Sequence, residues 1–513
     1  MRHAVRLGLA LPFIAFACTS FSGDDPPPGG VTPGSGDPDA AVDGSQDGPS
    51  VTTNPDDEIE ILEVPALTMA TEGTKVPVKV KLRRGTSVLG DIKIQIRTLP
   101  NKVVSIDGIT SGVDGEATLD VAPDAKQGPF DVVVEATAVS TNKKASKPLK
   151  LFVRGPAGTI DTTFGVNGAI GVPFGPNDNA VGYDLAVAPD DSIVLSSSCT
   201  QNGVQVGCFA RLTANGVLDT KFVKKTAATY AYGSTVTLPR SSAFDPNNVM
   251  NFGGTNEIGA AIGQIDSEGV VGSFGGGLNA PGASNNGPVY GLAVAPSGSL
   301  IAAFETTGTT SFAVYSGAFG FGTNGYSTGL TFGTTSSAPM AAGTLKSGDF
   351  FVLGVGKTAG TTYFGIVTVN ATTGAKTGGV SVPLPGADRG GYATGYAQLP
   401  DGSIVTGTGV GNRVLKFLPD GTALDPTFSA DPLPVGFRSL SVAVDSNGRI
   451  LVLTPGIIRL TPQGTLDPSF VLVGQPPSGE QPAEVLSAPR RIALQKDGRI
   501  IVGSGMGAAR FWN

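Results

Sequence analysis

The chain has 513 residues, of which 40% are hydrophobic, only 15% are charged and 74 are glycine. Its net charge of −7, without a block of Lys or Arg, argues against binding to nucleic acids and against electrostatic attachment to anionic lipid, because both need clustered basic side chains. Abundant glycine disfavours helix, and Val, Ile, Thr and Phe dominate between turns, so the composition predicts an all-β protein.

The first eighteen residues have the pattern of an export signal. Arg2 and Arg6 precede an apolar stretch, residues 7–17, that is too short to span a bilayer as a permanent helix. Small residues lead to Cys18, and the segment resembles the lipobox of bacterial lipoproteins, in which this cysteine becomes the acylated N-terminus. We predict a signal peptide over residues 1–17 and lipidation of Cys18, so that the membrane is reached through this lipid alone. A cleaved signal with an incidental cysteine is the alternative.

Residues 18–56 are rich in Gly, Pro and Asp and contain almost no large apolar side chains. Such a segment cannot bury enough surface to offset the entropy of ordering, so it is expected to be a disordered acidic linker. Together with the lipid it would tether a folded head to the cell envelope. We expect an exported protein attached to the outer membrane.

Residues 57–154 alternate with a period of two. Val78, Val80 and Leu82 share one strand face, while Lys79 and Lys81 occupy the other. Further strands are expected at 92–97, 115–121, 130–139 and 149–153, separated by turns. About 95 residues with this strand spacing predict an immunoglobulin-like β-sandwich, with the role of a spacer.

A hairpin pattern recurs seven times after the sandwich. Each copy is an apolar strand, a polar turn and a second apolar strand, and successive copies are 46 to 57 residues apart. Asp, Asn, Ser and Gly dominate the turns and tolerate positive φ. The third turn residues are Asp191, Asn248, Gly298, Gly348, Gly402, Gly448 and Gly498.

A second motif lies between these hairpins and reads IDTTF, LDTKF, LDPTF or LDPSF. We expect each aspartate to accept backbone N–H groups in its turn and each phenylalanine to pack between repeats. A ring of these carboxylates around a cation is the alternative. The motif residues are Asp161, Phe164, Asp219, Phe222, Asp425, Phe428, Asp467 and Phe470.

Each repeat of about fifty residues accounts for four strands, which is one blade of a β-propeller. We predict a seven-bladed propeller over residues 157–513, in which the C-terminal strand completes the first blade and closes the ring. The LDxxF motifs and the PDGSIV-like hairpins resemble the delta-60 repeat family of exported bacterial propellers. The resemblance implies a propeller fold and an exported location, but no defined activity.

The candidate chemistry is sparse. The chain has one histidine, His3, inside the expected signal, so neither a Ser-His-Asp triad nor a histidine metal site is expected in the mature chain. The GYSTG motif at 325–329 and the G-x-G-x-x-G match at 320–325 are interpreted as chance, because no helix pattern follows them. We predict no catalytic, cofactor-binding or metal-binding residue.

Cys199 and Cys208 lie within one expected hairpin of an exported chain. A four-residue turn, 202–205, would place them directly opposite, and we predict a disulfide between them. Two free buried thiols are the alternative.

These features favour an envelope lipoprotein whose propeller binds or displays a protein or glycan partner without catalysis. One alternative is a carbohydrate-acting lyase or hydrolase that works without histidine, with carboxylates such as Asp184 or Asp388 at the channel mouth. The other is a purely structural envelope component.

Overall fold

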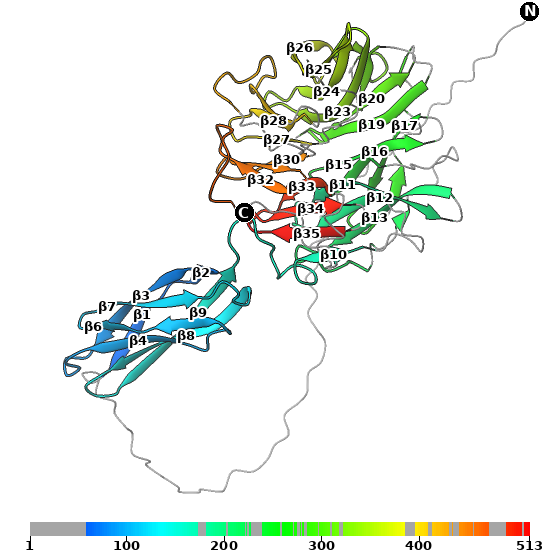
Figure 1. The fold of residues 1–513 in the computed structure, drawn as a ribbon. Helices are drawn as coiled ribbons and strands as arrows, with labels where there is room; N and C mark the ends of the chain where they lie inside the picture. Colours follow the sequence, from blue (N-terminus) through cyan, green and yellow to red (C-terminus); the bar gives the residue numbers. More distant parts are fainter. Residues whose placement is uncertain are drawn as a thin grey trace, which may run out of the picture. The chain divides into compact units, whose positions relative to one another are not determined.

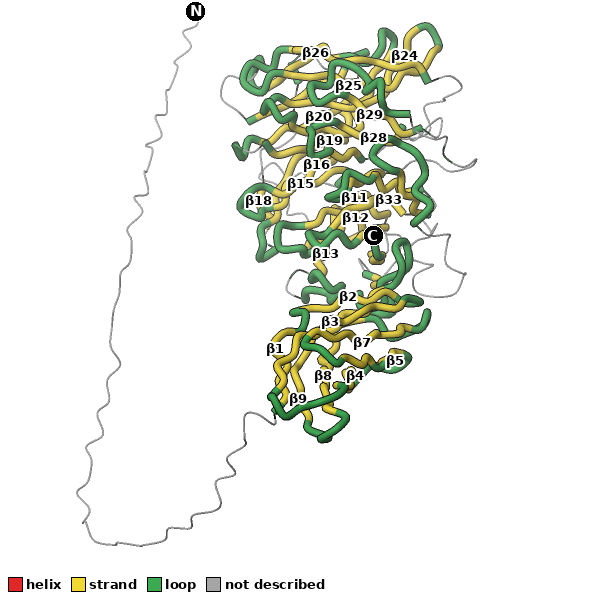
Figure 2. The backbone as a smooth tube through the Cα atoms, turned by 90° about the vertical axis from the view of Figure 1, so that its left-hand side faces the viewer, coloured by secondary structure: helices red, strands yellow, loops and turns green. Residues whose placement is uncertain are grey.

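The structure is a computed structural model, and its described residues consist of strands and loops without a helix (Figure 2). The predicted signal peptide and linker lie outside the described residues, as do Cys18 and Asp388. The described residues are 58–172, 181–201, 204–220, 222, 225–226, 239–256, 259–269, 271–273, 278, 280–281, 285–295, 297–307, 310–317, 322–384, 395–408, 413–429, 433, 441–454, 456–470, 489–504 and 507–513.

Nine strands form the first part of the fold, as two facing sheets. One sheet has the order β1-β3-β7-β5 and the other β2-β9-β8-β4-β6, in which β2 and β9 pair in parallel. The strands are β1 (Ile59–Glu63), β2 (Leu67–Thr71), β3 (Lys75–Arg84), β4 (Ile92–Arg97), β5 (Val103–Ile106), β6 (Gly108–Thr110), β7 (Asp114–Val121), β8 (Gly128–Ala138) and β9 (Lys144–Arg154). The immunoglobulin-like assignment stays a prediction.

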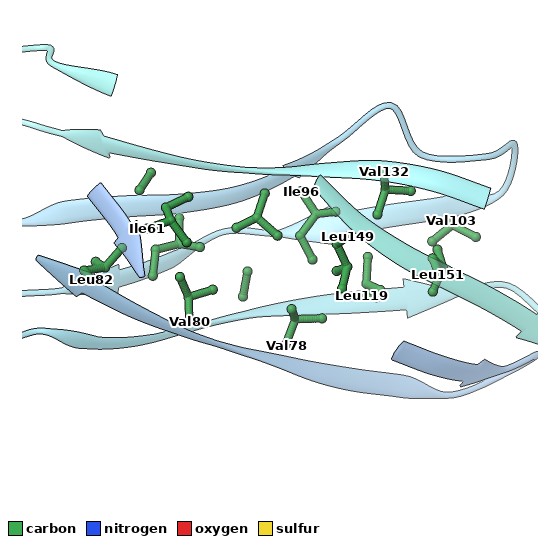
Figure 3. Close-up of a cluster of buried hydrophobic side chains, with 14 of the residues drawn as sticks. Ile61, Val78, Val80, Leu82, Ile96, Val103, Leu119, Val132, Leu149 and Leu151 are labelled. Atoms are coloured by element: carbon green, nitrogen blue, oxygen red, sulfur yellow. The ribbon is translucent and has the colours of Figure 1, made fainter. Parts of the chain in front are cut away.

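The core of this sandwich follows from the period-two pattern. Val78, Val80 and Leu82 of β3 are buried and contact Ile96 and Leu149 in one hydrophobic cluster between the sheets (Figure 3). The intervening lysines face outward because successive side chains of a strand point to opposite faces. The alternation thus places one apolar face of each sheet against the other.

The remaining strands form seven sheets within the described residues. The two ends of this region share one sheet, of β10 (Ala169–Gly171), β35 (Gly507–Phe511), β34 (Ile500–Ser504) and β33 (Pro489–Leu494). The next four sheets each contain four consecutive strands: β11 (Val181–Val187), β12 (Ile193–Gln201), β13 (Val204–Leu212) and β14 (Lys225–Thr226); β15 (Ser241–Phe244), β16 (Met250–Asn256), β17 (Gly259–Ile265) and β18 (Val271–Ser273); β19 (Asn285–Val294), β20 (Leu300–Thr307), β21 (Phe312–Ser316) and β22 (Tyr326–Leu330); β23 (Ser336–Thr344), β24 (Phe350–Thr358), β25 (Thr361–Val369) and β26 (Lys376–Pro383). Two sheets have three described strands: β27 (Tyr396–Gln398), β28 (Ile404–Gly407) and β29 (Val414–Phe417); β30 (Ser441–Val444), β31 (Ile450–Leu453) and β32 (Ile457–Leu460).

The hairpin turns between the first two strands of these sheets need a left-handed residue. The third turn residue has positive φ in all seven hairpins, from 64° at Asp191 and Asn248 to 97° at Gly402. Glycine adopts this conformation without a Cβ penalty, and Asp and Asn tolerate it better than other residues. The residue types at these turns are therefore set by backbone geometry.

The two ends of the repeat region pair with each other. Ala169 of β10 pairs with Ala509 of β35, and Ile160 bridges to Phe511 (Figure 1). The C-terminal strand thus joins the sheet that lies next to the first LDxxF motif, as we predict from the sequence. Pairing the ends in one sheet removes two strand edges that would otherwise be open to aggregation.

Two large side chains near the C-terminus are buried at this junction. Phe511 and Trp512 are 2% and 4% exposed. The Trp512 indole N–H donates to Gln127 Oε1 at 3.1 Å, and its ring meets Phe152 edge-on with 5.9 Å between centroids. Thr162, in the first LDxxF motif, also donates to Gln127 Oε1. Gln127 therefore accepts hydrogen bonds from both segments that meet at the closing junction, the first LDxxF motif and the C-terminal residues.

The hairpin that carries the predicted disulfide has a different register from the one expected. Gln201 pairs with Val204, so the loop is two residues long, and Cys208 lies opposite Ser197 while Cys199 lies opposite Val206. The expectation of directly opposed cysteines is therefore wrong, because it placed the turn at four residues. Cys208 is disulfide-bonded, and its pairing with Cys199 stays a prediction.

Candidate functional site

The first strands of all seven sheets surround one cavity of about 620 Å³. These strands are β11, β15, β19, β23, β27, β30 and β33. Because each sheet contributes its innermost strand, the cavity is the central channel of a β-propeller. Its volume lies within the range of small-molecule sites, roughly 300–1,000 Å³.

Four of the seven innermost strands have a β-bulge at the same level of the channel. The pairing register skips one residue just before Asp184, Gly291, Ala341 and Arg491. A bulge changes which side chains face a given side, and it commonly re-aims a functional side chain. Here it sets the direction of the two charged residues at this level, Asp184 and Arg491.

Asp184 and Arg491 form an ion pair across neighbouring strands of the channel. Arg491 Nε donates to Asp184 Oδ1, and the Ser242 hydroxyl donates to Asp184 Oδ2 at 2.5 Å. The Asp184 side chain is 2% exposed and that of Arg491 is 17% exposed. The buried Asp184 carboxylate therefore has a hydrogen-bond donor at each of its two oxygens.

The Arg491 side chain also extends past β30 to the residue before β27. A Cβ at Gly395, beside β27, would lie 2.9 Å from Arg491 Nη1 and 2.5 Å from the Ser441 hydroxyl. Glycine is therefore needed at position 395 to leave room for both groups. Among the described residues, neither Nη1 nor Nη2 of Arg491 has an acceptor.

Tyr396 follows Gly395 and lines the same cavity. Its ring meets Phe351 edge-on at 5.0 Å, and its hydroxyl lies where a Cβ of Gly343 would be only 2.4 Å away. Burial raises the pKa of Tyr396 to about 12, although the nearby Arg491 opposes this shift. The hydroxyl therefore stays protonated at neutral pH and is available as a hydrogen-bond donor.

The enzyme alternative required two carboxylates that converge at the channel mouth. Asp184 does lie in the channel, but it is paired with a cation, and Asp388 lies outside the described residues. Ser327 of the GYSTG motif lies on β22 rather than on a strand-to-helix turn. Within the described ranges, no three His, Cys, Asp or Glu side chains gather to hold a metal ion.

The LDxxF motifs are built around a basic residue that the sequence reasoning missed. Arg510 Nε donates to Asp161 Oδ2 at 2.7 Å, and the Thr163 N–H donates to Asp161 Oδ1 at 3.0 Å. The Arg510 guanidinium also lies 4.9 Å from the centre of the Phe164 ring. The same cation, carboxylate and aromatic ring recur in the sets Arg211, Asp219 and Phe222; Lys416, Asp425 and Phe428; and Arg459, Asp467 and Phe470.

This repeated set joins consecutive sheets instead of lining the channel. Phe222 packs with Phe209 of β13 and with Met250 and Phe252 of the following sheet, and Phe470 packs between its own sheet and Ile492. None of the four aspartates lines the cavity. The basic residue could have been found in the sequence, because it precedes each aspartate by eight or nine residues in three of the four copies.

The contribution of the Lys416–Asp425 pair to stability can be tested by varying the pH. Hydrogen bonds from Thr427 and then Lys416 lower the pKa of Asp425 to about 2. A lowered folded-state pKa contributes stability that is complete above the unfolded value near 4 and is lost as the pH falls through about 2. We expect the melting temperature of the wild type to exceed that of Asp425→Asn at pH 5, and the gap to narrow between pH 4 and pH 2. A gap that stays constant over this range would contradict the pairing.

A second hollow, of about 860 Å³, lies on the sandwich. Its charged side chains are Glu63, Lys79, Lys81, Asp114 and Glu116. Glu63 and Lys81 approach to only 4.0 Å and are 72% and 51% exposed, so the ion pair contributes little. The channel, with its buried polar groups, is the stronger candidate for a binding site.

The all-β fold with sheets around a central channel defines the chain as a β-propeller protein. A family model described as a domain of unknown function (DUF5122) β-propeller matches residues 188–222 and 446–470. None of the curated proteins matches the sequence.

Solved structures show distant likeness at low identity. An extracellular domain of the putative hybrid two-component system BT4673 from B. thetaiotaomicron is 12% identical, with a TM-score of 0.43 over 67% of this chain and 40% of that one. Drosophila Semaphorin 1a, extracellular domains 1–2, is 10% identical, with a TM-score of 0.40 over 66% of this chain and 86% of that one. A protein from Lactobacillus plantarum is 14% identical, with a TM-score of 0.37 over 74% and 94%. The chain spans well under half of the first of these proteins, and likeness at this level carries no functional argument.

Proposed function

We propose that the protein is an exported, lipid-anchored envelope protein whose β-propeller binds a ligand in its central channel without catalysis. The observation that carries this proposal is the hydrogen bonding of Asp184. It is the one carboxylate of the described residues at the bulged level of the channel, and Arg491 and Ser242 occupy both of its oxygens. Because the acceptor positions at both oxygens are already used within the protein, Asp184 is not free to contact a substrate in the way that a catalytic carboxylate must.

A ligand screen tests binding and catalysis together. The purified protein is incubated with fragments of envelope polysaccharides and peptidoglycan, and the melting temperature is recorded for each compound, because a ligand that binds only the folded state raises it. The same mixtures are followed by NMR for a day. We expect at least one compound to raise the melting temperature and to be recovered unchanged. A compound that is cleaved by the wild type, but not by Asp184→Asn, would replace the proposal with the enzyme alternative.

The lipid anchor is supported by the N-terminal sequence. Among the residues that the structure describes, no helix is long and apolar enough to cross a membrane. We expect wild-type cells to incorporate labelled palmitate into the protein and the protein to partition into the detergent phase of Triton X-114. Cys18→Ser should abolish both, because the acylated atom is the cysteine sulfur. Labelling that persists in Cys18→Ser would rule out this site, and Cys208→Ser provides a matched control that should keep its label.

A further inference from the structure

Two of the polar side chains that line the channel, Arg491 and Tyr396, have hydrogen-bond donors without a partner among the described residues. Both oxygens of Asp184 already accept bonds, while Nη1 and Nη2 of Arg491 have no acceptor among the described residues. The Tyr396 hydroxyl likewise has no partner there. A group that carries acceptors and no protons to donate is therefore the best complement to this wall.

The geometry of these hydrogen-bond donors further restricts the chemical class of the ligand. A guanidinium whose Nε is already bonded presents its remaining N–H groups in one plane, which matches the two oxygens of a carboxylate. The charged residues along the cavity are Asp184, Asp191, Arg491 and Lys496, so the lining has no net charge. A monoanion suits this balance better than a dianionic phosphate, which would place a second negative charge close to Asp184.

The cavity leaves room for more than the carboxylate. The side of the channel that faces Arg491 at the bulged level is formed by the small residues Gly291 and Ala341. Tyr290, which follows Val289 in the bulge of β19, lies on the same side with the Arg240 guanidinium 5.2 Å from its ring centre. About 620 Å³ accommodates a sugar ring or a molecule of similar size.

We infer that the central channel binds a small molecule through a carboxylate that bridges the terminal nitrogens of Arg491 and the hydroxyl of Tyr396. This inference rests on the proposed binding function and specifies its ligand class. It does not depend on the source of the molecule, which could be a free sugar acid or the acidic end of a glycan fragment. The carboxylate is the shared chemistry that the donors recognise.

Calorimetric titration of the purified protein at constant ionic strength tests this inference. Sodium D-glucuronate is the probe, and D-glucose is its matched neutral counterpart, since the two differ in the carboxylate. A glucuronate disaccharide in a further titration distinguishes a free sugar acid from a glycan end. We expect glucuronate to bind at least tenfold more tightly than glucose or inorganic phosphate.

Three variants assign the binding to the proposed residues. Arg491→Lys keeps a cation beside Asp184 but removes the planar donor pair, so the affinity should fall at least tenfold. Tyr396→Phe removes a single hydroxyl and should weaken binding by roughly threefold to tenfold, and it keeps the test valid if Arg491→Lys folds poorly. Arg449→Lys, in an Arg–Asp pair outside the channel, should bind like the wild type.

The possible outcomes distinguish a failure of the carboxylate site from a failure of the proposed binding function. Glucose that binds as tightly as glucuronate, or affinity that Arg491→Lys and Tyr396→Phe leave unchanged, would overturn the carboxylate site. Binding of other, uncharged compounds in the ligand screen would then still support a binding propeller. Turnover of glucuronate disaccharide by the wild type would instead overturn the non-catalytic function.

Discussion

Arg510→Ala is expected to destabilise the folded protein by about 3 kcal/mol, because it removes the closer of the two guanidinium groups that compensate the buried Asp161 carboxylate and leaves only Arg499, at 3.3 Å. Both side chains are 0% exposed, and Arg510 also donates to the Ala214 carbonyl and to Thr163. Burial lowers the pKa of Arg510 to about 10, partly offset by Asp161, so the guanidinium is still charged at pH 7. Urea denaturation measures the loss, and the fluorescence of Trp512, the single tryptophan of the chain, reports on the same junction.

Two comparisons separate the lost ion pair from general damage to the strand. The double variant Arg510→Met with Asp161→Asn removes both charges and keeps similar volumes, so it should recover most of the stability. Arg211→Ala breaks the equivalent pair of the next sheet, where the partners are 19% and 20% exposed, and should cost clearly less than Arg510→Ala. Equal losses in Arg510→Ala and Arg211→Ala would contradict a special role for the closing junction.

The parts of the fold that depend on local rules could be predicted from the sequence. The alternation of Val78, Val80 and Leu82 identifies the core face of β3, since a strand places every second residue on one side. Turn residues such as Asp191 and Gly402 mark hairpins, since their positive φ restricts the residue type. Repetition then indicates how such hairpins are arranged, because each repeat buries its faces against its neighbours.

Features that depend on strand register or on contacts between distant strands could not be predicted from such local rules. The position of Cys208 opposite Ser197 depends on the length of one turn, and a turn two residues shorter than expected shifts every pair along the hairpin. The contact between Asp184 and Arg491 joins residues 307 positions apart. Aligning the seven repeats on their turns does place both residues at the same position, seven residues before Asp191 and Gly498, which is the signal that could have found this pair.

Deletion of residues 507–513 is expected to abolish the folded monomer. The deletion removes β35, so β10 and β34 each lose a paired edge, and Asp161 loses Arg510, the closer of its two cations. Open edges of this kind pair with other chains, and the buried carboxylate keeps only its longer contact, to Arg499. Size-exclusion chromatography with light scattering should show aggregates, and far-UV circular dichroism should lose its sharp thermal transition. A monomer with an unchanged transition would show that the ends need not pair.

A single methyl group at Gly507 provides a milder version of the same test. Gly507 has a φ of 155°, and a Cβ there would lie 2.0 Å from the carbonyl oxygen of Ile170 on β10. Gly507→Ala must therefore push β10 and β35 apart, at a cost of about 1–3 kcal/mol, typical of overpacking. Gly317→Ala is the matched control, because a Cβ at Gly317 meets nothing within 4 Å. If the urea midpoint of Gly507→Ala equals that of Gly317→Ala, the pairing of the chain ends does not limit the stability of the propeller.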